Sequence, residues 1–279
     1  MSSIWLQRMA ASKAICKAAS DGNMTELRKI LLDVDVNVAS EPDSKYCGKS
    51  ALHLACESGK LNVARFLLSQ PTLNVNVCTP YGETPLFFAC QHGHVEIVQL
   101  LLARPEANVN ASNGNQWTAL HSACENGFTD VVRLLFTRPE LAVAEFSWRR
   151  TPMHLACQQG HLDIVRLLLA HPHVSCHIDS MNVSNATPVH LAAKRQHTPV
   201  VEALVLHALQ SWSSPSASSL EFWATFLDPA FPLAPIARAH AIQAAWAATS
   251  NANTQSSFRQ RLAEHFPAEN HPVLSLVVW

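Results

Sequence analysis

The chain has 279 residues, 48% of them hydrophobic and 15% charged, and its formal net charge is −1. This composition is that of a chain that can bury a core, and it excludes a largely disordered protein. Lysines and arginines are scattered along the sequence and are balanced by aspartates and glutamates, so we expect no nucleic-acid partner.

The amino-terminal end is apolar only over short stretches. The run near Ile4 stops at Gln7, which is too short for the core of a signal peptide. No later run reaches the roughly 18 apolar residues of a membrane span. We therefore expect no membrane span, and an intracellular protein of the cytoplasm, the nucleus or both.

Residues 12–32 form the first predicted repeat unit, after a short lead of residues 1–11. The unit holds Ala18-Ala19, then Gly22, then Leu27 and three apolar residues at 30–32. Later units have the same order, but they open with a tetrapeptide that is missing here. We interpret 12–32 as the amino-terminal cap of a repeat array.

An opening tetrapeptide recurs five times along the rest of the chain. Its copies start at residues 50, 84, 118, 151 and 187, which lie 34, 34, 33 and 36 residues apart. They read Ser-Ala-Leu-His, Thr-Pro-Leu-Phe, Thr-Ala-Leu-His, Thr-Pro-Met-His and Thr-Pro-Val-His. A fixed period in this range indicates units that must stack, because one unit cannot bury its apolar face alone.

Each tetrapeptide predicts the start of a helix, and a second helix follows. The Thr or Ser hydroxyl accepts from an orphan backbone N–H, and Pro at the first helical position has no N–H to leave unpaired. Glycines at 59, 93, 127 and 160 are placed to end the first helix. Apolar pairs such as Val63-Ala64 and Leu67-Leu68 then give the second helix a wide apolar stripe. Short links make the two helices antiparallel.

These registered columns resemble the ankyrin repeat, in which Thr-Pro-Leu-His opens the first of two antiparallel helices. The resemblance implies an all-α fold, an ankyrin-repeat solenoid of antiparallel helix pairs with extended loop fingers, in about six repeats over residues 12–210. Asn37, Asn76 and Asn110 hold the position that family members often offer to an asparaginyl hydroxylase. A role in turn geometry is the alternative that we favour.

The cysteines and histidines are interpreted as structural. Four of the eight cysteines, at 56, 90, 124 and 157, recur once per unit, so stacking places them about 10 Å apart, beyond the Cα separation of a disulfide. No Cys-x-x-Cys pair indicates zinc. The resemblance assigns the motif histidines, His53, His121, His154 and His190, to hydrogen bonds with the turn and the adjoining unit.

No catalytic signature appears in the sequence, whether nucleophile elbow, phosphate-binding loop or metalloprotease motif. We therefore predict that the protein is not an enzyme and has no catalytic residue, no cofactor and no metal. Free thiols fit a reducing compartment.

The resemblance implies partner binding on the loop fingers and on the exposed side of the first helices. Carried over position by position, it predicts these partner-binding residues: Tyr46, Lys49, Glu57, Tyr81, Glu83, Gln91, His92, Trp117, Glu125, Asn126, Trp148, Arg150, Gln158 and Gln159. Ser184, Lys194 and Arg195 continue the strip in the last unit.

Four of these residues place one large aromatic side chain on each of four successive fingers: Tyr46, Tyr81, Trp117 and Trp148. Aromatic rings dominate binding hot spots, so the pattern favours a ladder for an extended segment. The alternative is that each ring only covers its neighbouring turn.

After residue 210 the repeat pattern stops. Residues 211–219 are rich in serine and predict a linker, and residues 220–279 predict a small helical, apolar extension. The extension either covers the open end of the repeats or docks a second partner.

The sequence therefore predicts a non-catalytic scaffold that recognises a protein or peptide on the concave surface of fingers and first helices. The alternative is a substrate-recognition adaptor whose extension recruits a second partner such as a ubiquitin ligase. A monomer is the default expectation. The repeat pattern does not identify the partner, because repeat surfaces encode specificity in individual side chains.

Overall fold

The computed structural model describes residues 2–42, 44–142, 150–171, 178, 180–210, 226–227, 237–239 and 241–243. Within these ranges the regular elements are helices, and extended pairing is limited to isolated bridges such as that between Ala39 and Ser50. The chain divides into two compact units, residues 1–142 and 143–279. This division falls inside the single repeat domain expected over 12–210.

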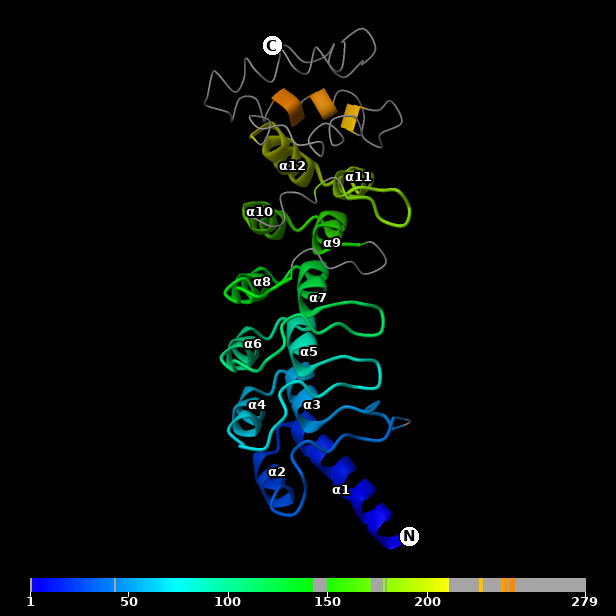
Figure 1. The fold of residues 1–279 in the computed structure, drawn as a ribbon, viewed down its shortest axis with the longest axis vertical. Coiled ribbons are helices and arrows are strands. Elements are labelled where there is room, and N and C mark those ends of the chain that lie inside the picture. The colour runs from blue at the N-terminus through cyan, green and yellow to red at the C-terminus, as the bar shows by residue number, and fades with distance from the viewer. Residues whose placement is uncertain are drawn as a thin grey trace. The chain divides into compact units, whose positions relative to one another are not determined.

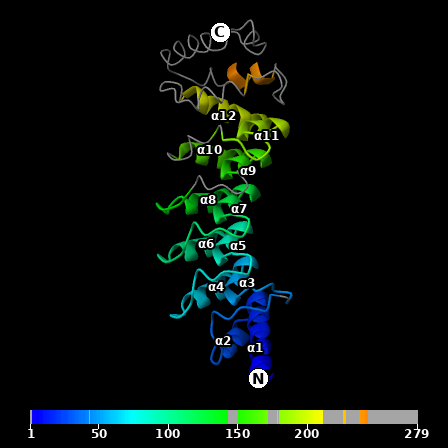
Figure 2. The ribbon, with the colours of Figure 1, turned by 45° about the vertical axis from the view of Figure 1, so that its right-hand side comes forward.

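In the first unit the helices form two layers (Figure 1). One layer contains α1 (Ser2–Asp21), α3 (Ala51–Glu57), α5 (Pro85–Gln91) and α7 (Ala119–Asn126). The other contains α2 (Met24–Ile30), α4 (Leu61–Leu68), α6 (Val95–Leu102) and α8 (Thr129–Leu135). In the first layer each helix packs on the next, in the second layer α4 packs on α6 and α6 on α8, and the two helices of each repeat pack on each other. Figure 2 shows the layers side by side. Helix α1 begins at Ser2, within the residues 1–11 that were expected to form a short lead.

Four helices are described within the second unit: α9 (Pro152–Gln159), α10 (Leu162–Ala170), α11 (Pro188–Lys194) and α12 (Thr198–Gln210). Helix α9 packs on α10 and α11, and α12 packs on α10 and α11. In the predicted extension, the described Arg238 is buried and donates to the carbonyl of Phe226 at 2.8 Å. The predicted linker 211–219 and most of 220–279 lie outside the described residues.

The first helices begin where the tetrapeptides predict. Thr84 Oγ1 accepts the backbone N–H of Phe87 at 3.2 Å, and Pro85 occupies the first turn of α5, where its missing N–H leaves no donor unpaired. Thr151 and Pro152 do the same for α9. The helix-start prediction is therefore confirmed.

The glycine columns have a second role beyond ending a helix. Gly93 has φ +71°, and a Cβ built on it would lie 2.5 Å from the ring of Phe128 in the next repeat. Gly160 has φ +79°, and a Cβ built on it would lie 2.6 Å from the His197 ring. Because both positions combine a left-handed backbone with a ring that leaves no room for a Cβ, each favours glycine.

The core lies between the two helix layers. Val63, Ala64 and Leu67 of α4 are almost fully buried, and the same columns are buried in α6, α8 and α10. Cys56, Cys90, Cys124 and Cys157 are completely buried in the first helices, which confirms that they are small core side chains. Burial raises the pKa of the first three thiols well above the ordinary value, so they stay protonated.

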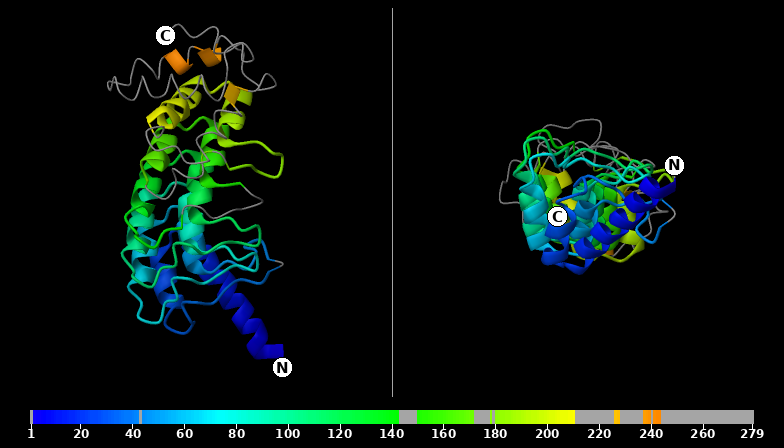
Figure 3. Two further views of the ribbon diagram at one scale, coloured as in Figure 1. Left: turned by 45° about the horizontal axis from the view of Figure 1, so that its top comes forward. Right: turned by 90° about the horizontal axis from the view of Figure 1, so that it is seen from below.

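The fingers of the first unit are joined to one another by asparagine side chains. Asn76 Nδ2 donates to the carbonyl of Glu106 at 2.7 Å, and its Oδ1 accepts the N–H of Asn108 at 2.8 Å. Asn37 and Asn110 each make the same two bonds to the next repeat. These asparagines therefore connect neighbouring turns as well as shaping their own. Figure 3 shows the loops ahead of α5 and α7 projecting from the same side of the first unit.

Candidate functional site

Two positions recur eight residues apart in five of the repeats, and in two of these repeats their side chains are in contact. One residue immediately precedes the amino-terminal capping residue of the first helix, and the other lies eight residues later, near the end of that helix. We call them the paired positions: Lys49 and Glu57, Glu83 and Gln91, Trp117 and Glu125, Arg150 and Gln158, and Ala186 and Lys194.

The paired positions before and on α3 hold an ion pair. Lys49 Nζ lies 2.7 Å from Glu57 Oε1, and the two side chains are 17% and 31% exposed. The ammonium group also lies 4.4 Å from the centre of the Phe88 ring of the next repeat, a cation–π contact. This pair fixes the base of the finger against the first helix.

The paired positions before and on α9 use a neutral partner instead. The Arg150 guanidinium donates through Nη2 to Oε1 of Gln158. Together with the loop 180–187 and α11, this pair borders a pocket of about 440 Å³. Its lining residues are Arg150, Gln158, Asn182, Val183, Ser184, Ala186, His190, Leu191 and Lys194.

The predicted aromatic ladder is wrong at its first position. Tyr46 is only 7% exposed, whereas Tyr81 is 66% exposed. The positive φ angles of Cys47 and Gly48 turn the chain directly after Tyr46, and its ring lines a pocket against α1. Trp117 is half-buried and stacks on the His121 ring at 6.2 Å, as the alternative interpretation expected. Trp148 lies outside the described residues.

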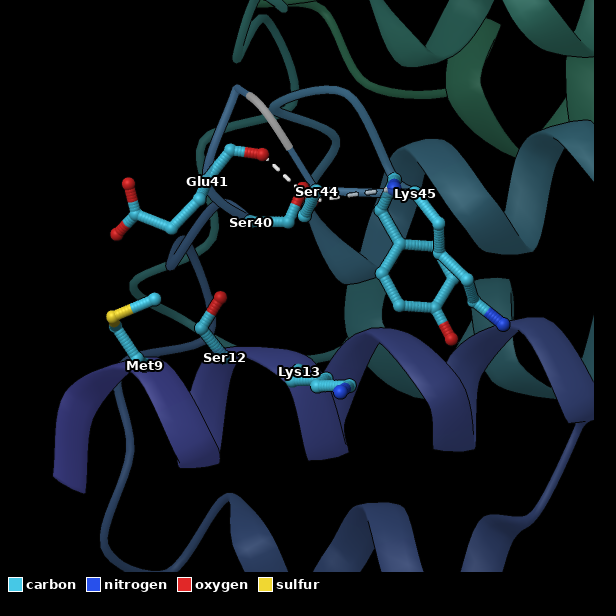
Figure 4. Close-up of a pocket in the computed structure, with 8 residues that line it drawn as sticks. Met9, Ser12, Lys13, Ser40, Glu41, Ser44 and Lys45 are labelled. Atoms are coloured by element: carbon cyan, nitrogen blue, oxygen red, sulfur yellow. Dashed lines mark hydrogen bonds between the residues drawn. The ribbon is translucent and has the colours of Figure 1, made fainter. Parts of the chain in front are cut away.

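The pocket beside Tyr46 is a site that the sequence did not indicate. It has about 400 Å³ and lies between α1 and the loop 40–46 (Figure 4). Met9, Ser12 and Lys13 of α1 lie opposite Ser40, Glu41, Ser44 and Lys45 of the loop. Ser44 Oγ donates to the carbonyl of Glu41 at 2.6 Å, which closes the loop. No motif marks this pocket, because its α1 wall extends into the part of the chain expected to be a lead.

The remaining predicted residues lie at the ends of the first helices. Gln91 and Glu125 are half-buried, whereas His92, Asn126 and Gln159 are exposed. The loop residues just before the first helices and the last residues of those helices are together called the front surface. It comprises Lys49, Glu57, Tyr81, Glu83, Gln91, His92, Trp117, Glu125 and Asn126 in the first unit, and Arg150, Gln158, Gln159, Ala186 and Lys194 in the second.

The motif histidines form structural hydrogen bonds within and between repeats. The backbone N–H of Ser50 donates to His53 Nδ1 at 3.1 Å, so this nitrogen carries no proton. His53 Nε2 lies 3.0 Å from the carbonyl of Glu83 in the next repeat and therefore donates to it. His154 makes the same two bonds, to the N–H of Thr151 and the carbonyl of Ala186. Burial lowers the pKa of His53 and of His154 to about 4.

Within the described residues, no three His, Cys, Asp or Glu side chains gather in a way that could hold a metal ion. Among the helices of the described residues, none has the length and hydropathy of a membrane span.

A comparison with family models agrees with the repeat architecture. The model described as "Ankyrin repeats (3 copies)" matches residues 7–77, 71–142 and 139–213. These matches cover well over half of the chain, including the front surface of both units. No curated protein matches the chain significantly.

Proposed function

The chain belongs to the ankyrin-repeat family, and from that premise we propose that it is a non-catalytic interaction module that recognises a protein or peptide on its front surface. Ankyrin repeats are generally protein–protein interaction modules. Beyond this general role, we propose that the front surface binds the partner and that the protein is not a catalyst.

The observation that carries the proposal is the contrast between two sets of positions in the same repeats. The capping hydroxyl recurs in all five units that have the opening tetrapeptide, and the core cysteine and the glycine before the second helix recur in four of them, because these columns serve the fold. The paired positions hold Lys, Glu, Gln, Trp, Arg and Ala in changing combinations. Side chains that vary on a constant frame are free to encode recognition of a partner.

The chemistry of the buried groups supports the non-catalytic part of the proposal. A reactive cysteine needs a lowered pKa and access to solvent, and the buried thiols have raised pKa values. A general base needs a pKa near the working pH, whereas burial holds His53 and His154 near 4. We place the protein inside the cell, which the free thiols of the described cysteines support.

The proposal is tested by affinity capture with the full chain and two triple variants. The front variant carries Tyr81→Ala, His92→Ala and Asn126→Ala, all at exposed positions of the front surface. The matched control carries Arg65→Ala, Gln99→Ala and Arg133→Ala, which are exposed at equivalent places on α4, α6 and α8. All three proteins should melt alike, because exposed substitutions change stability little.

We expect that some proteins captured by the wild type are also captured by the control variant but not by the front variant. Partners that both variants retain would show that the front surface of the first unit is not the recognition surface. Partners lost only from the control would move the site to the second helices.

A further inference from the structure

Lys49 shows how the front surface holds a positive charge. Its Nζ lies 2.7 Å from Glu57 Oε1 and 4.4 Å from the centre of the Phe88 ring in the next repeat. The same ammonium group therefore meets a carboxylate and an aromatic ring. Both contacts favour a cation, because the face of an aromatic ring carries partial negative charge. In this repeat the chain fills the site with its own lysine.

Glu83 holds the column of Lys49 one repeat later and reverses its charge. Its paired position is the neutral Gln91. The Glu83 carboxylate accepts a hydrogen bond from the Thr79 hydroxyl at 3.2 Å. Within the part of the chain that the structure describes, the ion pairs do not include Glu83, which is half-buried. A partly buried carboxylate of this kind attracts a positive group of a partner.

The finger that carries Glu83 contacts the finger that carries Trp117. The two residues hold the same position, directly before the capping residues of α5 and α7. Between the two loops, the N–H of Gly114 donates to the carbonyl of Tyr81 at 2.7 Å. Figure 3 shows both loops on the same side of the first unit. Glu83 and Trp117 therefore belong to adjacent fingers of one continuous surface.

These two fingers also supply aromatic surface. Tyr81 lies two residues before Glu83 and is 66% exposed. The Trp117 ring is half-buried and stacks on the His121 ring, which fixes its orientation. The two fingers therefore offer a carboxylate and aromatic rings, the combination that holds Lys49 in the preceding repeat.

Both fingers are held in shape from within. Thr79 is buried, and its Oγ1 accepts the backbone N–H of Tyr81 at 3.3 Å and that of Glu83 at 3.2 Å. In the next finger, Asn113 Oδ1 accepts the N–H of Trp117 at 3.0 Å. Such loops need little ordering when a partner binds, which lowers the entropic cost of association.

We propose that these two fingers bind a basic peptide segment of a partner, with a lysine or arginine side chain paired to Glu83 and resting on the rings of Tyr81 and Trp117. The inference rests on the proposed function and names the chemistry of the partner. A cationic side chain suits this surface, because charge-assisted hydrogen bonds to a carboxylate are strong and aromatic faces attract cations.

The test uses two variants of the full chain and one matched control. Glu83→Gln removes the charge but keeps an oxygen that accepts from Thr79, and Tyr81→Ala removes the exposed ring. The control is Glu96→Gln, which removes the same charge from the same repeat at an exposed position of α6. A phage-displayed random peptide library is selected on the wild-type chain. Binding of the enriched peptides to all four proteins is then measured by fluorescence anisotropy.

We expect enriched peptides that contain lysine or arginine. Their affinity should fall about tenfold with Glu83→Gln and severalfold with Tyr81→Ala, while Glu96→Gln leaves it unchanged. Replacing the basic residue of the peptide by neutral acetyl-lysine or citrulline should weaken binding to the wild type much more than binding to Glu83→Gln. Thermal melts should show that all four proteins are folded.

Three outcomes would overturn the inference. Enriched peptides without basic residues, or ones that bind Glu83→Gln or Tyr81→Ala as tightly as the wild type, would show that the partner has another chemistry. An equal loss with Glu96→Gln would assign the effect to the overall charge of the first unit. A selection that enriches no peptide would exclude an isolated basic segment as the ligand. Each of these results leaves the proposed function standing, because affinity capture with the front variant tests it independently.

Discussion

The imidazole of His53 connects two repeats only while it is neutral. Its Nδ1 accepts from the first turn of α3, and its Nε2 donates to the carbonyl of Glu83 in the following finger. Protonation would put a second donor against the Ser50 N–H and a charge into a buried site. The α5 repeat shows what the fold does without this residue, because Phe87 stands in the same column.

The histidines predict how stability depends on pH. Burial lowers the pKa of His53 and His154 to about 4 from an ordinary 6.5, so between these values the unfolded chain binds more protons than the folded one. The two neutral histidines make their full contribution to the free energy of unfolding above about pH 6.5, and this contribution is lost as the pH falls toward 4. The free energy of unfolding changes by up to about 1.4 kcal/mol per pH unit for each histidine. Urea unfolding at several values between pH 7 and pH 5 measures this slope.

A variant isolates the part of the slope that comes from one histidine. His53→Phe copies the α5 repeat, so the folded state should tolerate it, and its stability should vary less with pH than that of the wild type. A free energy of unfolding that stays constant between pH 7 and pH 5 in the wild type would contradict the prediction.

The bridging asparagines predict a large effect from a small change. Asn76→Ala removes one bond to Glu106 and one to Asn108, and it leaves the carbonyl and the N–H of the next turn without this partner. We expect a loss of about 2 kcal/mol in the free energy of unfolding, measured by chemical denaturation. Asn62→Ala, at an exposed position of α4, is the control and should change it by less than about 0.5 kcal/mol. Equal losses at both positions would show that the bridge is unimportant.

At the scale of the helix pair, the close approach of Gly93 to Phe128 can be tested by adding one methyl group. Gly93→Ala would place a Cβ 2.5 Å from the Phe128 ring on a backbone with φ +71°. Gly114 lacks a positive φ, and its nearest neighbour to an added Cβ is the Tyr81 carbonyl oxygen at 3.5 Å. We expect Gly93→Ala to lower the free energy of unfolding by at least about 1 kcal/mol and Gly114→Ala to change it little.

A double variant separates the ring contact from the backbone strain. In a Phe128→Ala background the added methyl group meets no ring, so Gly93→Ala should destabilise less there than in the wild type. Equal effects in both backgrounds would mean that the left-handed backbone accounts for all of the loss.

The helices could be predicted from the sequence because their causes are local and repeated. A capping hydroxyl, a proline or alanine and a later glycine act within one unit, and five registered copies remove the ambiguity of any single one. The burial of Tyr46 could not be predicted in the same way. It depends on the turn at Cys47 and Gly48 and on an α1 that begins at Ser2, neither of which repeats elsewhere. The pocket beside Arg150 could be predicted only in part: Arg150, Gln158, Ser184 and Lys194 were expected on the binding strip, but the pocket itself was not, because its walls come from two different repeats.

On the scale of the whole molecule, the chain has two compact units, with the division after residue 142. The first unit holds its own end in place, because Asn110 accepts the N–H of Ala142 at 2.8 Å and donates to the carbonyl of Glu140. In repeat proteins each repeat is stabilised mainly by its neighbouring repeats, so a cavity in the core destabilises the nearby repeats most.

This division predicts that a core cavity in one unit lowers protection mainly in that unit. Leu52 of α3 is fully buried in the first unit, and Leu168 of α10 is fully buried in the second. Truncation of either to alanine should cost about 2–5 kcal/mol locally. By hydrogen–deuterium exchange with mass spectrometry, Leu52→Ala should speed exchange in peptides from α3 to α8 and spare those from α9 to α12, and Leu168→Ala should do the reverse. If both variants speed hydrogen–deuterium exchange uniformly along the whole chain, the two units unfold as one cooperative body. In that case the effect of neither cavity would be confined to its own side of residue 142.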